Sequence, residues 1–196
     1  MPHLKIAIQK SGRLSDDSLK LLESCGIKFA KSKDKLFWYG RNMPVDLLLI
    51  RDDDIPRLLL DGVCDLGICG QNVAEECALE RQINSHDLKA EVALGFGDCR
   101  LCLAIPEDQA FESIHDLNGK RIATSYPSLT QQYLDKNNIQ ADIVELSGAV
   151  EIAQVWDLLM PSLILFLQAL HYVQTTYVKW LMSLRANQHC IAVLDN

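Results

Sequence analysis

The chain has 196 residues, and its 48% hydrophobic and 23% charged residues are typical of a globular protein rather than a disordered or fibrous one. Its 19 basic and 26 acidic residues give a net charge of -7, which argues against binding to a nucleic-acid backbone. This length accommodates one domain or two small lobes, with a core that needs no disulfide.

The first half of the chain alternates strands and helices through short turns. Ser15 is the predicted N-cap of the first helix, and Gly26 is predicted to end it. Strands are predicted over residues 4–9, 45–50 and 64–70. A helix is predicted after each strand: over about 15–25, over a short stretch after 51–56 that ends at about 61, and over about 72–80. Such alternation predicts an α/β fold with a mainly parallel sheet and flanking helices.

A second set of elements begins near residue 98. Strands are predicted over residues 99–105, 121–124 and 143–146, with a turn at 118–119 and a helix over 129–136. Ile191–Leu194 is interpreted as a strand that returns to the first set. We therefore predict two lobes with a cleft between them: residues 1–97 plus 189–196 form lobe one, and residues 98–188 form lobe two.

Seven cysteines are spread along the chain, and no basic segment followed by an apolar one precedes the first strand. We therefore expect a cytoplasmic protein with reduced, mostly buried thiols. Cys99 and Cys102 form a C-x-x-C pair, but strand alternation would put their thiols on opposite faces. No second pair has zinc-site spacing, so we predict no metal or redox site at this pair.

Two strand ends of lobe one carry residues that suit an anion. The segment 9–13, Gln-Lys-Ser-Gly-Arg, joins a strand to a helix, where free backbone N–H groups and two cations can bind a phosphate. Arg51 follows the next strand, at the carboxyl end where ligand sites collect in open α/β sheets. For each motif taken alone, the ordinary explanation is favoured: a strand–helix turn for the first and a charged helix cap for the second.

Lobe two carries hydroxyl groups at corresponding strand ends. Ser125 and Tyr126 follow one strand, where hydroxyls can bind phosphate, although turn chemistry also explains them. Ser147 and Glu151 follow the next strand and are explained by a cap and a solvated carboxylate. The chain has no Walker A motif, no G-x-G-x-x-G and no Ser-His-Asp spacing. The residues alone therefore indicate a two-lobed α/β protein that binds an anionic small molecule.

Taken together, these segments resemble ATP phosphoribosyltransferase, the first enzyme of histidine biosynthesis. The segment Arg-Asp-Asp-Asp-Ile-Pro resembles the long form, which carries a C-terminal regulatory domain for histidine feedback, and the chain would end before that domain. The resemblance implies two lobes like those of periplasmic binding proteins. It runs from residue 4 to about 153 and rests on residues 6–17, 42–46, 51–56, 65–72, 99–101, 117–127 and 146–151.

The resemblance implies a reaction in which N1 of ATP attacks C1 of phosphoribosyl pyrophosphate, and pyrophosphate leaves with the assistance of Mg²⁺. The site must position two polyanions and stabilise a ribosyl centre with carbocation character. We expect a homo-oligomer, with no nucleic acid or membrane as a partner. Glu151 matches a family glutamate expected to face the ribose. Carried over by position, the substrate-binding candidates are Gln9, Lys10, Ser11, Gly12, Arg13 and Arg51, with Asp65, Cys99, Arg100, Ser125 and Tyr126 as weaker ones.

After residue 153 the chain departs from the family pattern. The family continues with Gly-Leu-Gly, an Ala-Asp-Ala-Ile-x-Asp-Leu-Val strand and a Ser-Thr-Gly-x-Thr phosphate loop. This chain has no glycine there, and Ile164 stands where an aspartate is expected. A shift of the reading frame by one nucleotide, with permitted codon choices, restores Gly-Leu-Gly-Ser-Ala-Asp-Ala-Ile-Leu-Asp-Leu-Val-Ser-Thr-Gly from residue 154 onward. We therefore hypothesise a frameshift that begins near Gln154 and ends before about His189.

The same hypothesis explains an uncharged run over residues 158–178, which is long enough for a membrane helix. Pro161, Gln168, His171 and Gln174 interrupt its apolar character, and we expect no membrane span.

Two functions remain open. The chain is an ATP phosphoribosyltransferase, or it is a non-catalytic two-lobed module that binds ATP or AMP but not phosphoribosyl pyrophosphate. A loop with glycine and threonine in residues 154–188 would favour the enzyme, whereas the residues as given favour the module.

Overall fold

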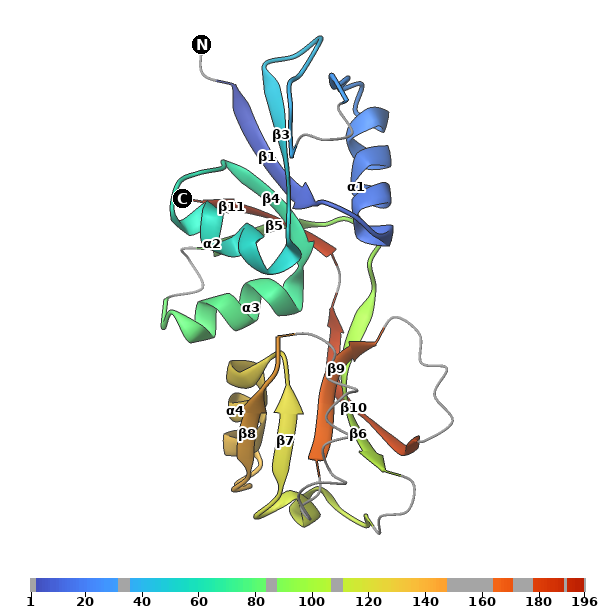
Figure 1. The fold of residues 1–196 in the computed structure, drawn as a ribbon, viewed down its shortest axis with the longest axis vertical. Helices are drawn as coiled ribbons and strands as arrows, with labels where there is room; N and C mark the ends of the chain where they lie inside the picture. The colour runs from blue at the N-terminus through green and yellow to red at the C-terminus, as the bar shows by residue number, and fades with distance from the viewer. Residues whose placement is uncertain are drawn as a thin grey trace. The chain divides into compact units, whose positions relative to one another are not determined.

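The computed structural model describes residues 3–31, 36–83, 88–106, 111–147, 164–170, 178–188 and 190–195 (Figure 1). The chain divides into two compact units. Unit 1 consists of residues 1–98 and 188–196, and unit 2 consists of residues 99–187. Each unit contains its own β-sheet, and none of the described strands belongs to both sheets. Within the described residues, no helix has both the length and the apolar character needed to cross a bilayer.

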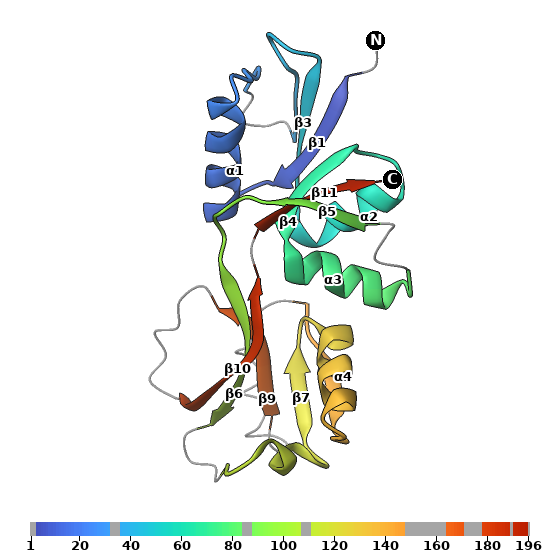
Figure 2. The same ribbon diagram turned by 180° about the vertical axis from the view of Figure 1, so that it is seen from behind.

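Unit 1 is built on a six-stranded sheet with the order β2-β3-β1-β4-β11-β5. β1 is parallel to β3 and to β4, whereas β2 is antiparallel to β3, and β11 is antiparallel to both β4 and β5. Figure 2 shows β11 between β4 and β5 from behind. The strands are β1 (Leu4–Gln9), β2 (Phe37–Trp38), β3 (Val45–Ile50), β4 (Leu66–Gly70), β5 (Leu88–Ala93) and β11 (Cys190–Asp195).

Two hydrophobic layers hold helices against the two faces of this sheet. Because side chains alternate along a strand, Ile8 of β1 packs with Leu22 of the first helix, whereas Ala7 packs with Ile55 and Leu59 on the other face. All five side chains are buried. The helical elements of unit 1 are α1 (Arg13–Ser24), the 3-10 turn η1 (Asp52–Asp54), α2 (Ile55–Leu60) and α3 (Gln71–Glu80).

Unit 2 is built on a five-stranded sheet with the order β10-β6-β9-β7-β8. β7 is parallel to β8 and β9, and β6 is antiparallel to β9. A core that includes Leu103, Leu117, Ile122 and Leu134 packs between sheet and helix. The elements are β6 (Cys99–Pro106), η2 (Ile114–Leu117), β7 (Arg121–Thr124), α4 (Pro127–Lys136), β8 (Asp142–Glu145), β9 (Ile164–Leu170) and β10 (Val178–Gln188).

The predicted α/β fold with mainly parallel strands is confirmed, and most predicted elements lie within two residues of their observed bounds. The predicted returning strand is present as β11. Sequence reasoning missed β2, β5, β9, β10 and η2. β2 has only two residues, and five of the six residues of β5 are exposed, so neither has the buried apolar pattern by which strands are recognised.

Candidate functional site

The carboxyl ends of β1, β3 and β4 lie at one edge of the unit 1 sheet, because these three strands are parallel. The connection from β1 to α1 begins here. The backbone N–H of Lys10 donates to the carbonyl oxygen of Ile50, the last residue of β3, at 2.7 Å. This bond holds the connection after β1 beside the connection after β3. The predicted segment 9–13 and Arg51 therefore share one edge of one sheet.

The N-terminus of α1 has no side-chain cap. The helix begins at Arg13, and Gly12 precedes it with φ +94°, a left-handed conformation that favours glycine. Ser15, the predicted N-cap, is instead the third residue of the helix and is buried. The cap prediction was wrong because Gly12 lets the helix start two residues earlier. The first backbone N–H groups of α1 therefore have no capping oxygen from a side chain.

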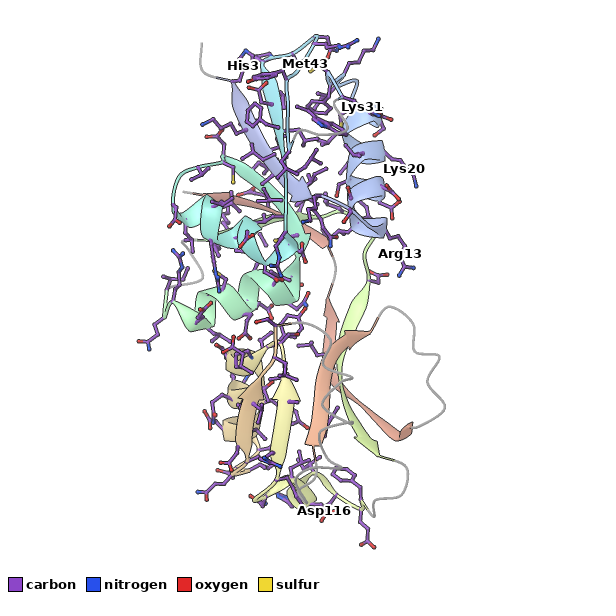
Figure 3. The ribbon with its side chains drawn as sticks, in the orientation of Figure 1. His3, Arg13, Lys20, Lys31, Met43 and Asp116 are labelled. Atoms are coloured by element: carbon purple, nitrogen blue, oxygen red, sulfur yellow. The ribbon has the colours of Figure 1, made fainter. Side chains whose placement is uncertain are left out.

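Two cations at this helix start are exposed and form no ion pair within the described part of the chain. They are Lys10 and Arg13, and Figure 3 labels Arg13 at the first turn of α1. Further along α1, by contrast, Lys20 lies 2.9 Å from Asp17. Arg51 has a weak partner, because its guanidinium lies 3.7 Å from the Asp53 carboxylate and both side chains are mostly exposed. These cations are available to an anionic ligand.

Asp52 is a half-buried residue that the sequence did not single out as a site residue. It accepts a hydrogen bond from the backbone N–H of Gly70, the last residue of β4. Its Oδ1 atom has essentially no solvent-exposed surface and no hydrogen-bond partner among the described residues. Burial, and then the negative charge of Asp53, raise the pKa of Asp52 from 3.8 to about 7, although the bond from Gly70 lowers it. The only sequence signal was its position in an Asp-Asp-Asp run directly after a strand.

Asp65 lies at the opposite end of the sheet from segment 9–13. It precedes β4, and its carboxylate accepts a 2.7 Å hydrogen bond from the backbone N–H of Lys5, near the start of β1. The Asp65 N–H in turn donates to the Lys5 carbonyl oxygen at 2.9 Å. The structure therefore does not bring Asp65 together with Lys10 and Arg13, and its contacts are those of a residue that joins two strands.

We expect the substitution Asp65→Ala to reduce stability without changing nucleotide affinity. Loss of the bond to the Lys5 N–H should lower the free energy of unfolding by about 1 kcal/mol. Urea unfolding measures the first effect, and isothermal titration with AMP measures the second. A loss of AMP affinity as large as that of Arg13→Ala would contradict this assignment.

In unit 2, Ser125 and Tyr126 connect β7 to α4. The backbone N–H of Tyr126 donates to the Thr124 hydroxyl at 2.9 Å, and the Thr130 hydroxyl donates to the Tyr126 carbonyl oxygen at 2.6 Å. Thr124 and Thr130 are buried, so these bonds fix the connection at the carboxyl end of β7. Ser125 and Tyr126 remain half-buried at that edge.

Cys99 and Arg100 begin β6 at the same edge of the unit 2 sheet. The backbone register pairs Arg100 with Leu170, the last residue of β9, and β9 is parallel to β7. The start of β6 therefore lies beside the carboxyl ends of the parallel strands. Glu151 lies outside the described residues.

The position of β9 bears on the predicted phosphate loop. Thr124, the last residue of β7, is paired with Leu167, and β9 continues along β6 for three residues beyond that point. A continuous strand therefore occupies residues 164–170, which include the positions where the family pattern has Ser-Thr-Gly.

Comparisons with known proteins identify the family. The family model described as HisG, ATP phosphoribosyltransferase, matches residues 51–159, which is more than half of the chain. The chain belongs to the ATP phosphoribosyltransferase family. The match ends inside residues 154–188, the segment where the sequence departs from the family pattern. The resemblance stated from the motifs is confirmed.

Curated members of the ATP phosphoribosyltransferase family support this assignment. The chain is 55% identical over 152 residues to the enzyme of Stenotrophomonas maltophilia and 54% identical over 152 residues to that of Xylella fastidiosa strain M12. Each alignment covers 76% of this chain and 50% of the relative. The chain therefore spans about half the length of the curated relatives that it matches.

Solved structures agree with the family and with the predicted fold class. The ATP phosphoribosyl transferase (HisG:HisZ) complex from Thermotoga maritima has a TM-score of 0.73 and 27% identity, covering 98% of this chain and 87% of that chain. An ancestral arginine-binding protein bound to arginine has a TM-score of 0.59 and 15% identity, covering 100% of this chain and 85% of that chain. This second likeness shows that the chain shares its fold with that arginine-binding protein.

Proposed function

We propose that the chain carries the reaction of its family, in which ATP and phosphoribosyl pyrophosphate condense to phosphoribosyl-ATP and pyrophosphate, the first step of histidine biosynthesis. Family membership supports the reaction type. The observation that carries the proposal is the start of α1. There, cations without an ion pair among the described residues and backbone N–H groups without a side-chain cap lie at the carboxyl ends of three parallel strands. Such an arrangement suits a phosphate group, because both the cations and the backbone N–H groups stabilise negative charge.

We assign the nucleotide to unit 1 and phosphoribosyl pyrophosphate to unit 2. Lys10, Arg13 and Arg51 supply positive charge, and the amides of the first turn of α1 supply hydrogen-bond donors. In unit 2, Arg100, with Cys99 beside it, and the hydroxyls of Ser125 and Tyr126 are proposed to bind phosphate groups. Glu151 keeps the proposed role of facing the ribose, where a carboxylate would stabilise positive charge that develops at C1.

Mg²⁺ is proposed to enter with the phosphates rather than through a site made by side chains alone. Within the described ranges, no group of three or more His, Cys, Asp or Glu residues could hold a metal ion. Mg²⁺ is commonly bound by substrate phosphates and water with few protein ligands. When bound, it would neutralise charge on the departing pyrophosphate.

The proposed nucleotide site is tested by removing single cations. Arg13→Ala and Arg51→Ala should each weaken AMP binding by roughly tenfold to a hundredfold, because a hydrogen bond from a charged group contributes about 1.5–3 kcal/mol. Isothermal titration measures this change. Lys20→Ala is the matched control, since Lys20 lies on α1 but pairs with Asp17. Equal losses in all three variants, or none in any, would contradict the assignment.

A second candidate function is a nucleotide-binding module without catalysis, and β9 is the observation that favours it. If the strand over residues 164–170 persists in solution, unit 2 has no glycine loop for phosphoribosyl pyrophosphate. The two functions differ in one measurement. The enzyme binds both AMP and phosphoribosyl pyrophosphate, whereas the module binds AMP alone.

We further propose that the protein is a cytoplasmic homo-oligomer, as expected for a biosynthetic enzyme. The Thermotoga maritima relative was solved as a complex of two named components, which supports assembly with other subunits. Light scattering coupled to size-exclusion chromatography tests the homo-oligomer, because a single species of 196-residue mass would contradict it.

A further inference from the structure

The carboxyl group of Asp52 connects two strand ends of unit 1. Asp52 follows β3 by two residues, and its carboxyl accepts the N–H of Gly70 at the end of β4. β1 lies between β3 and β4 in the sheet. This hydrogen bond therefore links the connections that follow the two strands flanking β1, whose own connection leads to Lys10 and Arg13.

The space around the end of β4 is tightly filled. A Cβ atom added to Gly70 would lie 2.6 Å from Oδ1 of Asn72, whose side chain is buried. The remaining oxygen of Asp52, Oδ1, is shut off from solvent with no partner among the described residues. A buried carboxylate with one donor and no cation is unfavourable, whereas a neutral acid can occupy this position at much lower cost.

The charged groups around Asp52 oppose its ionisation or are engaged elsewhere. Asp53, its neighbour in η1, raises the pKa of Asp52 through its negative charge, and Arg51 is paired with Asp53. On the side of β4 and α3, Gln71 is neutral and donates to Glu75 at 2.6 Å. On the side of β1 and α1, the cations are Lys10 and Arg13, which are exposed to solvent.

We propose that Asp52 is a positioning residue of the nucleotide site: as a neutral acid it holds the Gly70 amide and keeps negative charge away from the bound phosphate, and loss of its proton weakens anion binding. This inference rests on the proposed function of unit 1. Its physical basis is linkage. An anion bound at this edge stabilises the neutral form of Asp52, so the site takes up a proton on binding at a pH where the free protein has lost it.

The experiment is isothermal titration of the full chain with AMP at pH 6 and pH 8.5, in wild type, Asp52→Asn and Asp53→Asn. Asparagine has the shape of the neutral acid and cannot ionise. A unit charge near a bound anion changes its affinity by about tenfold at an effective dielectric constant of about 20. We therefore expect the ratio of affinities between pH 6 and pH 8.5 to be about tenfold larger in wild type than in Asp52→Asn. The ionisation of AMP itself, with a pKa near 6, cancels in this comparison.

Asp53→Asn is the matched control, because it removes an adjacent exposed carboxylate and leaves Asp52 able to ionise. It should keep the pH response of wild type, moved to a slightly lower pH because Asp52 then has a lower pKa. A second measurement needs no variant. Titrations of wild type at pH 8 in two buffers of different ionisation enthalpy should show uptake of about 0.4 proton for each AMP bound, because tenfold coupling moves the pKa of Asp52 by about one unit.

The possible results separate the inference from the function on which it rests. The same pH response in wild type and Asp52→Asn, or no proton uptake by wild type, overturns the role of Asp52 and leaves nucleotide binding intact. A failure of AMP to bind any of the three folded proteins at either pH overturns the proposed nucleotide site, and the role of Asp52 with it. If Asp52→Asn does not fold, the proton uptake of wild type decides.

Discussion

Restoring the family reading frame from residue 154 to about residue 188 should raise the rate of pyrophosphate release by several orders of magnitude over the chain as given. Phosphoribosyl pyrophosphate carries several negative charges, and a Ser-Thr-Gly-x-Thr loop binds them with amides and hydroxyls that glycine allows to approach closely. In the chain as given, residues 164–170 form β9, which pairs with β6 and, up to Leu167, with β7. Amides that pair within the sheet are not available to a phosphate.

The size of this effect follows from the number of contacts. Several hydrogen bonds of roughly 1–3 kcal/mol each would be lost, and each 1.4 kcal/mol corresponds to about tenfold in rate. The measurement is a coupled pyrophosphate-release assay with ATP and phosphoribosyl pyrophosphate. The matched control is the restored chain with alanine at the loop hydroxyls and leucine at the loop glycine. Comparable turnover by the restored chain and the chain as given would refute the claim that this segment carries the missing phosphate site.

Unit 2 should also gain stability in the restored chain. The family pattern from residue 154 onward alternates apolar and small residues as a buried strand requires, and the out-of-frame residues do not follow that pattern. Unit 1 should respond much less, because the segments that form its sheet lie outside residues 154–187. AMP binding by the chain as given is therefore expected to survive when turnover does not.

The second large effect is on stability. Asp52→Asn should make the protein more stable than wild type at pH 8 and leave it equally stable near pH 4. The pKa of Asp52 is raised from 3.8 to about 7 in the folded protein, so the folded state binds this proton more tightly than the unfolded state does. Wild-type stability therefore falls as the pH rises from about 4 to about 7, and the loss is complete above pH 7.

A difference of about three pKa units corresponds to a free energy of unfolding on the order of 4 kcal/mol, which asparagine recovers because it has no proton to lose. Urea unfolding at pH 4 and pH 8 measures it. Asp53→Asn should change the stability far less at either pH, since the Asp53 side chain is 68% exposed. A wild-type protein whose stability rises between pH 4 and pH 8 relative to Asp52→Asn would show that the carboxylate is stabilised by its surroundings instead.

The sequence was sufficient for the fold class because the apolar strands of unit 1 are short, uninterrupted and followed by helix signals. β1 and β3 were predicted with their observed bounds. It was not sufficient for the helix start, since Ser15 is a common capping residue and the positive φ of Gly12 is a property of the folded backbone. The surroundings of the Asp52 carboxyl include the backbone N–H of Gly70, which lies eighteen positions later in the chain. No local sequence pattern predicts this contact. Asp65 was grouped with the site by its family motif, but its partner Lys5 is at the opposite edge.

The insertion of β11 between β4 and β5 has a consequence for how the protein is made. β4 ends at Gly70 and β5 begins at Leu88, yet the strand that pairs with both begins at Cys190. During synthesis, the central strands of unit 1 can pair as they leave the ribosome, but β4 keeps an open edge until more than a hundred further residues have been translated. Contacts so distant in sequence slow folding, and unpaired strand edges promote aggregation. A nascent chain that stalls within unit 2 would therefore present this open edge, and its yield of soluble protein would depend on chaperones that cover it.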